Sequence, residues 1–413
     1  MRRKETRAFG QGEMGAYHEQ GMPFADNGAV AEAQAGRWSV RIGIDARAAI
    51  WYRGTGIGTY TYQLCRHLYD LYDAAAPERL RLFWPGEEYR QLHITQEEVF
   101  RLVEQNRERF WEEVHIPQAI QREKIDLYHV PQNGIGLPAS KACKLVVTIH
   151  DLIPYICPET VGRGYLRIFL EEMPRILERV DHIIAPSRCT ACDLMQIAGV
   201  PEEKITVIYE AAEPIYRPLD KARARAFMQE KYGVSRPYVL YVGGFSPRKN
   251  LRLLIHAFHQ VRRQLPEDYC LVLPGKQSKE FNDIEIMVTS RGLQEHVHFI
   301  GFVGVDDLPW IYNGASVFVY PSLYEGFGLP PVEAMACGTP TLVANVASLP
   351  EVAGDGALLF SPVRAGQLEE LLFALLTDPA LAAELGERGL RRAACFSWRQ
   401  AALSTGEVFA RLV

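Results

Sequence analysis

The chain contains two successive runs of alternating strands and helices, and this pattern restricts its possible folds more than any other feature. The first run predicts strands at residues 40–45, 125–130, 144–149, 182–185 and 206–209, and helices at 60–71, 165–179 and 189–197. The proline-bearing segment 213–218 interrupts the pattern. The second run predicts strands at 238–242, 269–274, 297–300, 316–320 and 341–344, and a helix at 250–263. Such alternation is typical of the α/β class, so we predict two doubly wound, Rossmann-like parallel sheets that bind ligands beyond the carboxyl ends of their strands.

A chain of 413 residues is too long for one ordinary hydrophobic core, which indicates two domains. We predict an N-terminal domain over residues 39–217, a C-terminal domain over 218–395 and a final helix over 396–413. Residues 1–38 lack the apolar run of a signal peptide, and we interpret them as a disordered extension.

The composition is that of a soluble enzyme, with 48% hydrophobic and 23% charged residues. A net charge of −5 argues against nucleic acid as the main partner. No uninterrupted apolar run is long enough to span a membrane, and the eight scattered cysteines fit a reducing cytoplasm. Residues 163–179 mix arginines with aromatic and aliphatic residues, which fits either a half-buried helix or a peripheral contact with the inner membrane face.

Residues 320–340 carry the strongest chemical signal. A strand leads into a loop with Gly326 and Gly328, and a helix is expected to begin at the Pro330–Pro331 pair. A glycine turn before a helix N-terminus is an anion site, because free N–H groups and the positive dipole end point outward. Glu325 and Glu333 would repel a phosphate, so we interpret them as acceptors for hydroxyl groups. A nucleotide sugar is a ligand that contains both phosphate groups and hydroxyl groups. The alternative is a capped helix after a tight turn, with two surface glutamates.

A second glycine loop follows the strand that is predicted at residues 238–242. It contains Gly243 and Gly244 and continues into the pair Arg248–Lys249 before a helix. Arg248 can bind two oxygens of a departing diphosphate and Lys249 can add a point charge, although a solvated basic turn has the same composition. Because the chain has no Asp-x-Asp pair, we expect these cations to replace a metal, and we predict neither a metal nor a cofactor.

The string from Glu325 to Pro340, E-G-F-G-L-P-P-V-E-A-M-A-C-G-T-P, resembles the signature of the retaining glycosyltransferases of family four. This resemblance covers residues 40–413 and implies the GT-B fold, with a ligand cleft between an acceptor domain and a nucleotide-sugar domain. It also implies that the final helix crosses back onto the N-terminal domain.

The resemblance also implies roles for single residues. His150, in the segment Thr148–Pro154, lies beside the sugar at the reacting centre, together with Glu325, Arg248 and Lys249. Glu333 accepts from ribose hydroxyls and Glu325 from hydroxyls of the transferred sugar. Further contacts with the donor are implied for Gly56, Gly58, Gly243, Gly244, Gly326, Phe327, Gly328, Leu329 and, near the base, Val303.

These features predict a retaining, metal-independent glycosyltransferase. It would move a hexose from a nucleoside-diphosphate sugar to a hydroxyl of a saccharide or lipid-linked acceptor. The strings Pro-Arg-Lys-Asn and His-Asp-Leu-Ile-Pro resemble mannosyltransferase-like members and favour mannose. Two other functions stay open: a nucleotide-sugar epimerase of similar shape, and a sugar-nucleotide-binding protein without catalysis.

Overall fold

A computed structural model describes residues 40–73, 79–84, 115–275 and 280–413 of the chain. All of these described residues belong to one compact unit. The predicted disordered extension over residues 1–38 lies outside the described residues.

The first sheet has six parallel strands in the order β2-β1-β3-β4-β5-β6. Their bounds are β1 Ile42–Asp45, β2 Leu80–Phe83, β3 Leu127–Val130, β4 Lys144–Thr148, β5 His182–Ala185 and β6 Ile205–Val207. Ile42 pairs with Leu80 on one side and with Leu127 on the other. The helices of this half are α2 Arg47–Trp51, α3 Gly56–Asp73, α6 Ile116–Glu123, α7 Ile153–Ile156, α8 Arg163–Arg179 and α9 Arg188–Ala198, with 3₁₀ turns at Pro158–Thr160 and Glu202–Lys204.

The second sheet also has six parallel strands, in the order β12-β11-β10-β7-β8-β9. Their bounds are β7 Tyr238–Leu240, β8 Cys270–Pro274, β9 Val297–Gly301, β10 Val317–Tyr320, β11 Thr341–Ala344 and β12 Leu358–Phe360. The helices that follow the first half are α10 Lys221–Tyr232, α11 Leu251–Val261, α12 Phe281–Ser290, α13 Leu308–Gly314, α14 Leu329–Ala336, α15 Leu349–Ala353, α16 Ala365–Thr377, α17 Pro379–Ala393 and α18 Trp398–Leu412, with 3₁₀ turns at Pro247–Lys249 and Arg262–Gln264.

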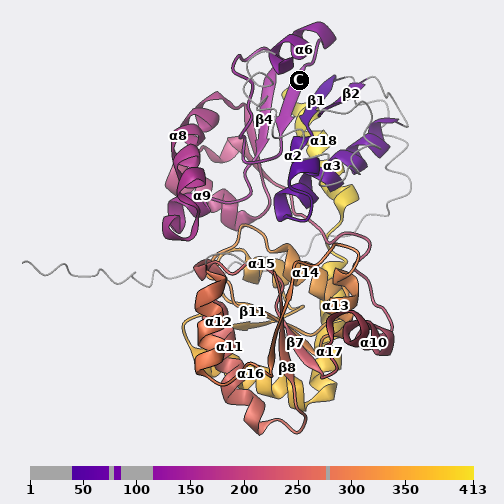
Figure 1. Ribbon diagram of the computed structural model, residues 1–413. Coiled ribbons are helices and arrows are strands. Elements are labelled where there is room, and N and C mark those ends of the chain that lie inside the picture. Colours follow the sequence, from indigo (N-terminus) through magenta and orange to yellow (C-terminus); the bar gives the residue numbers. More distant parts are fainter. Residues whose placement is uncertain (1–39, 74–78, 85–114, 276–279) are drawn as a thin grey trace, which may run out of the picture. The chain divides into compact units, whose positions relative to one another are not determined.

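Helices cover both faces of each sheet (Figure 1). Around the second sheet, α11 and α12 lie on one side and α13 and α17 on the other. The central strands are therefore buried on both faces, and all four residues of β10 are buried. This burial explains why the strands are continuous apolar runs rather than alternating ones.

The predicted α/β class with two doubly wound sheets is confirmed. Strands β2 and β12, which are four and three residues long and lie at the outer edge of each sheet, were not predicted from the sequence. The helix expected at Pro330–Pro331 is α14, which begins one residue earlier. Its N-cap, Gly328, has a φ of +106°, a backbone conformation that favours glycine.

The last helix, α18, packs against α3 of the first half of the chain. The rings of Trp398 and Tyr60 lie 5.8 Å apart, and those of Phe409 and His129 lie 5.4 Å apart. Arg411 also donates a hydrogen bond to Thr206, at 3.1 Å. The assignment of domains to residues 39–217, 218–395 and 396–413 stays a prediction.

Candidate active site

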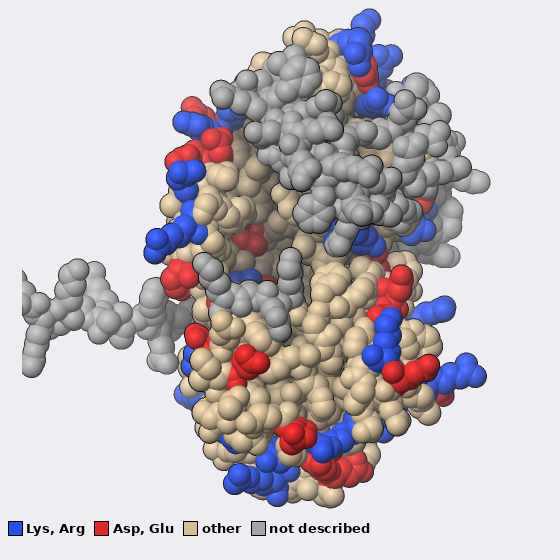
Figure 2. All heavy atoms as spheres, viewed as in Figure 1, with Lys and Arg blue, Asp and Glu red and all other residues tan. Residues whose placement is uncertain are grey.

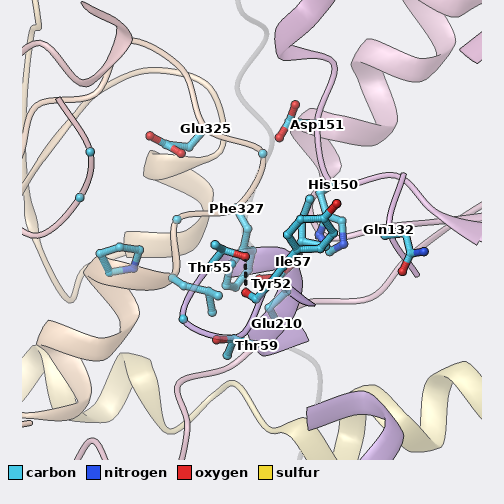
Figure 3. A pocket seen from close by; sticks show the side chains of 18 of the residues that line it. Tyr52, Thr55, Ile57, Thr59, Gln132, His150, Asp151, Glu210, Glu325 and Phe327 are labelled. Atoms are coloured by element: carbon cyan, nitrogen blue, oxygen red, sulfur yellow. Dashed lines mark hydrogen bonds and ion pairs between the residues drawn. The ribbon is translucent and has the colours of Figure 1, made fainter. Parts of the chain in front are cut away.

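One cavity of about 810 Å³ collects residues from the loops that follow the strands of both sheets (Figure 3). Most of the residues predicted from the sequence line it: Gly56, His150, Gly243, Gly244, Lys249, Glu325, Gly326, Phe327, Gly328, Leu329 and Glu333. A cavity of this size matches those that bind small ligands and cofactors.

Three predicted residues are absent from the cavity lining: Gly58, Arg248 and Val303. Gly58 faces the Tyr52 carbonyl so closely that a Cβ would lie 1.9 Å from its oxygen, which gives this glycine a packing role. Val303 is buried, and its neighbours Val305 and Leu308 line the cavity instead. Arg248 lies just behind the wall, where its guanidinium group contacts Glu325.

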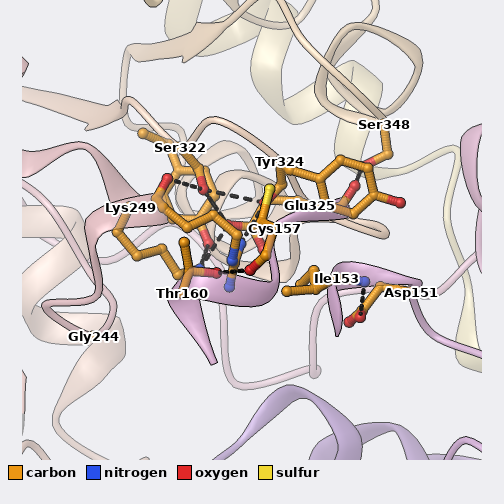
Figure 4. Close-up of polar contacts among 12 residues, drawn as sticks. Asp151, Ile153, Cys157, Thr160, Gly244, Lys249, Ser322, Tyr324, Glu325 and Ser348 are labelled. Atoms are coloured by element: carbon orange, nitrogen blue, oxygen red, sulfur yellow. Dashed lines mark hydrogen bonds and ion pairs between the residues drawn. The ribbon is translucent and has the colours of Figure 1, made fainter. Parts of the chain in front are cut away.

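Arg248 and Lys249 both bind the carboxylate of Glu325. Figure 4 labels Lys249, Glu325 and their neighbour Ser322. The two cations belong to the 3₁₀ turn Pro247–Lys249, and Glu325 belongs to the loop after β10. Arg248 Nη1 and Lys249 Nζ each lie 2.7 Å from Glu325 Oε1, which also accepts from the Ser322 hydroxyl. A single carboxylate oxygen therefore holds three donors, two of them charged.

Opposing effects act on the pKa of Glu325. Burial favours the neutral acid, but Lys249 and Arg248 favour the carboxylate more strongly, so the pKa lies below its ordinary value. Breaking a buried ion cluster is costly when a charge loses its partner. The two cations are thus held in place for an anion, and in this structure the anion is a side chain of the protein.

The loop from Glu325 to Gly328 is held by hydroxyl groups and by close packing. Ser187 Oγ donates to the Gly326 carbonyl at 2.6 Å, and Ser348 Oγ donates to the Glu325 carbonyl at 2.8 Å. A Cβ on Gly326 would lie 1.9 Å from the His150 carbonyl oxygen. Glycine is required here because the loop touches the segment that carries His150.

His150 follows β4 and is nearly buried, with 7% of its surface exposed. Both ring nitrogens face acceptors: Nδ1 lies 3.1 Å from Glu210 Oε1, and Nε2 lies 2.8 Å from the Pro131 carbonyl oxygen. Burial lowers the pKa of His150, but Glu210, the Pro131 carbonyl and Asp151 together raise it more, and the net shift is upward. The next residue, Asp151, accepts from the Ile153 N–H at 2.9 Å and so fixes the start of α7.

Glu333 projects from α14 and accepts a hydrogen bond from the Tyr312 hydroxyl at 2.8 Å. Burial raises the pKa of Glu333 from its ordinary 4.5 to about 7, and the nearby carboxylate of Glu213 adds to the rise. Near neutral pH this carboxyl group can thus be either a donor or an acceptor toward hydroxyl groups.

Glu333→Gln should stabilise the protein increasingly as pH rises. A carboxyl whose pKa is raised on folding contributes stability below its unfolded pKa and loses it as pH rises through its folded pKa. The difference in unfolding free energy between variant and wild type should therefore grow between pH 4.5 and 8, by up to about 3 kcal/mol. Urea unfolding at pH 5 and pH 8 measures it, with the exposed Glu370→Gln as control. A difference that does not change with pH would contradict the assignment.

Two acidic residues of the site are not among those that the sequence predicted. Glu210 and Glu213 both line the cavity, and Glu213 accepts from Arg53 Nη2 at 2.8 Å. The segment 213–218, which the sequence indicates only as an interruption between the two runs, thus also contributes to the cavity. Glu210 could have been found from its place just beyond the carboxyl end of β6, where a doubly wound sheet presents functional groups.

Comparison with known proteins assigns this site to a family. Residues 35–214 match the model of Glycosyltransferase Family 4, and residues 224–392 match Glycosyl transferases group 1. The chain is 31% identical to O-antigen chain mannosyltransferase B of Escherichia coli, over 70% of this chain and 74% of that protein. The chain belongs to glycosyltransferase family 4. It is therefore a glycosyltransferase, as the sequence motifs predicted.

Two further matches agree with this assignment. This chain is 34% identical to serotype-specific mannosyltransferase WbdA of Escherichia coli. The match covers 69% of this chain but only 36% of WbdA, which is the longer protein. Among solved structures, sucrose-phosphate synthase from Thermosynechococcus elongatus superposes with a TM-score of 0.69 at 25% identity, over 90% of this chain and 98% of that chain. The predicted GT-B fold is confirmed.

Two features are absent from the described part of this glycosyltransferase. No group of three or more His, Cys, Asp or Glu residues there is arranged to hold a metal ion. None of the helices in those segments has the length and apolar character that crossing a membrane requires. On the face drawn in Figure 2, basic and acidic side chains are interspersed and form no continuous basic surface among the coloured residues.

Proposed function

We propose that this family 4 enzyme is a retaining, metal-independent transferase that moves mannose from GDP-mannose to a hydroxyl group of a saccharide or lipid-linked acceptor. The observation that carries the proposal is the contact of Arg248 and Lys249 with one carboxylate beside the cavity. Two adjacent cations near a glycine loop form a site for a diphosphate, which can take the place that Glu325 now occupies.

The diphosphate leaving group gathers negative charge as its bond to the sugar breaks. Arg248 can bind two of its oxygens, and Lys249 adds a compact charge, so both act most strongly on the departing group. Once the cations bind the diphosphate, Glu325 is released to accept from hydroxyls of the sugar. Glu333 is suited to the ribose, because it lies on α14, which follows the glycine loop, and lines the same cavity.

Retention requires the acceptor to attack on the face from which the diphosphate leaves. The bond from the anomeric carbon to the diphosphate oxygen breaks, and the acceptor oxygen forms its bond on that same face. The acceptor's proton passes to the departing diphosphate oxygen. We assign no nucleophile to the protein, because the departing diphosphate takes the acceptor's proton and the released Glu325 carboxylate is placed on the hydroxyls of the sugar.

The choice of mannose rests on relatives. O-antigen chain mannosyltransferase B and mannosyltransferase WbdA are 31% and 34% identical to this chain. Both names refer to mannose. A relationship at this level supports the same class of sugar, and we extend it to GDP as the nucleotide because of the Pro-Arg-Lys-Asn string.

We also propose that the enzyme works in the cytoplasm and meets lipid-linked acceptors by a peripheral contact. Helix α8 exposes Tyr165, Ile168 and Leu170 together with Arg163 and Arg167. This combination suits an anionic lipid surface, since arginines attract the headgroups while apolar side chains enter the interface.

The test is a donor panel of GDP-mannose, GDP-glucose, UDP-glucose and ADP-glucose, with manno-oligosaccharide acceptors and with EDTA present. We expect GDP release from GDP-mannose, a new α-mannosyl linkage by NMR, and no loss of rate with EDTA. Use of UDP-sugars alone would refute the mannose assignment, and a β-linkage would refute retention. An isomerised sugar nucleotide without acceptor would indicate an epimerase, and binding without turnover a non-catalytic protein.

A further inference from the structure

His150 and Glu210 form a buried pair whose hydrogen bonds define its protonation. Nε2 of His150 faces the Pro131 carbonyl at 2.8 Å, and a carbonyl can only accept, so this nitrogen carries a proton. Nδ1 faces the Glu210 carboxyl group at 3.1 Å, and one proton lies between them. Imidazole is the stronger base by about two pKa units, so the proton belongs to the ring. The geometry therefore describes an imidazolium paired with a carboxylate.

Few other ionisable groups face His150 in the described residues. The side chains of the pair are 9% and 4% exposed. From α3, the Tyr60 ring meets the imidazole edge-on at 4.7 Å. From β3, His129 is close enough to feel its charge, but burial, with a smaller effect of His150, lowers the pKa of His129 to about 3, so it stays neutral. Asp151, the next residue in the chain, is the other carboxyl group that acts on His150.

Both members of the pair line the cavity (Figure 3). They come from segments after β4 and β6, and the His150 carbonyl accepts from Thr190 Oγ1 at 3.1 Å. Because both N–H groups point to protein acceptors, His150 cannot donate to a sugar or remove a proton without breaking the pair. It can instead supply a ring of fixed orientation and a fixed positive charge on the cavity wall, in the segment that touches the loop of Glu325.

We propose that Glu210 is a positioning residue that keeps His150 protonated and fixed in the active conformation during transfer. Only the catalytic part of this inference rests on the proposed function, and the charged pair does not depend on it. When Glu210 is replaced by glutamine, no carboxylate is left to hold the imidazolium. Nδ1 of the neutral His150 then accepts a hydrogen bond from the glutamine amide. The enzyme should then need solution protons to restore the charge, so it should lose activity at a lower pH than the wild type.

The experiment compares wild type with Glu210→Gln, which keeps shape and a hydrogen bond, and with the exposed Glu203→Gln as control. In the free protein, NMR of labelled histidine follows His150, assigned by the signal that His150→Gln removes. We expect the pKa of His150 to lie above 6.5 in wild type and to be clearly lower in Glu210→Gln. The alkaline limb of kcat/KM for GDP-mannose should shift by the same amount, because one unit changes the protonated fraction about tenfold.

We compare activities as the ratio of variant to wild type at each pH. In this ratio, the effects of groups that titrate in both proteins, such as Glu333, cancel. We expect Glu210→Gln to fall about tenfold or more below wild type at pH 8, and to approach it at pH 5.5. An unchanged His150 titration would overturn the charged pair. A shifted titration with an unshifted activity profile would overturn the positioning role. A protein that titrates as expected but releases no nucleoside diphosphate from any donor would overturn the proposed function and the catalytic part of this inference, while the charged pair stands.

Discussion

The Lys249→Ala variant should lose about 10²–10³-fold in kcat, the effect of removing one preorganised donor from a developing anion. Lys249 Nζ lies 2.7 Å from Glu325 Oε1 and 2.7 Å from the Tyr320 hydroxyl, so it is held in position before a donor arrives. A cation held in this way needs no reorganisation when the diphosphate departs. The affinity for GDP should also fall, by about tenfold, which corresponds to about 1.4 kcal/mol. Steady-state kinetics and calorimetry measure the two effects.

Two companion variants separate charge from packing in this experiment. Lys249→Met keeps most of the side-chain volume and should show the same kinetic loss with a smaller loss of stability. Arg252→Ala removes an exposed cation three residues along the chain, 64% exposed, and should leave both kcat and GDP affinity unchanged. Unaltered GDP affinity in Lys249→Ala would remove this lysine from the diphosphate site.

The Glu325→Gln variant should have opposite effects on binding and on turnover. In the free protein, the Glu325 carboxylate competes with any incoming anion for Arg248 and Lys249. Removal of its charge should let GDP bind about tenfold more tightly, since hydrogen bonds to charged groups are worth about 1.5–3 kcal/mol each. Transfer of mannose should nevertheless fall about 10²-fold or more, because the sugar loses a charged acceptor for its hydroxyls.

Tighter GDP binding together with slower turnover would show that the diphosphate replaces the Glu325 carboxylate at the two cations. Simple damage to the site would not give this combination. A disrupted site would lose GDP affinity together with turnover, and Glu325→Ala tests whether the amide itself matters. The exposed Glu384→Gln, 66% exposed on α17, serves as the control for a change of net charge. Weaker GDP binding in Glu325→Gln would mean that the carboxylate orders the cations rather than competing with the diphosphate.

A buried cluster of one carboxylate and two cations is not expected to add much to stability. Removing three charged groups from water costs free energy that their mutual attraction only partly returns. Such a cluster is better understood as a ligand site whose charges are kept in place by a side chain until the ligand arrives. This interpretation unites the two variants, because Lys249→Ala removes a partner of the diphosphate and Glu325→Gln removes its competitor.

Local patterns in the sequence were enough to predict the fold class and the glycine loops that line the cavity. The strand before Gly243 and the strand before Gly326 were both predicted, and both glycines line the cavity. Hydrophobic periodicity and glycine-bearing turns act over a few residues, so they can be recognised without tertiary information. The match of the 325–340 string to a family added the catalytic class, which local patterns alone did not give.

The sequence by itself thus determined two parallel sheets with glycine loops at the ends of their strands, since backbone preferences and burial patterns are local. Only the tertiary structure decided which side chains meet in those loops. Glu210 reaches His150 across 60 residues, Lys249 reaches Glu325 across 76, and Tyr312 reaches Glu333 across 21. These contacts depend on strand order, which brings distant carboxyl ends together, and burial in one cavity then sets the charge of each group.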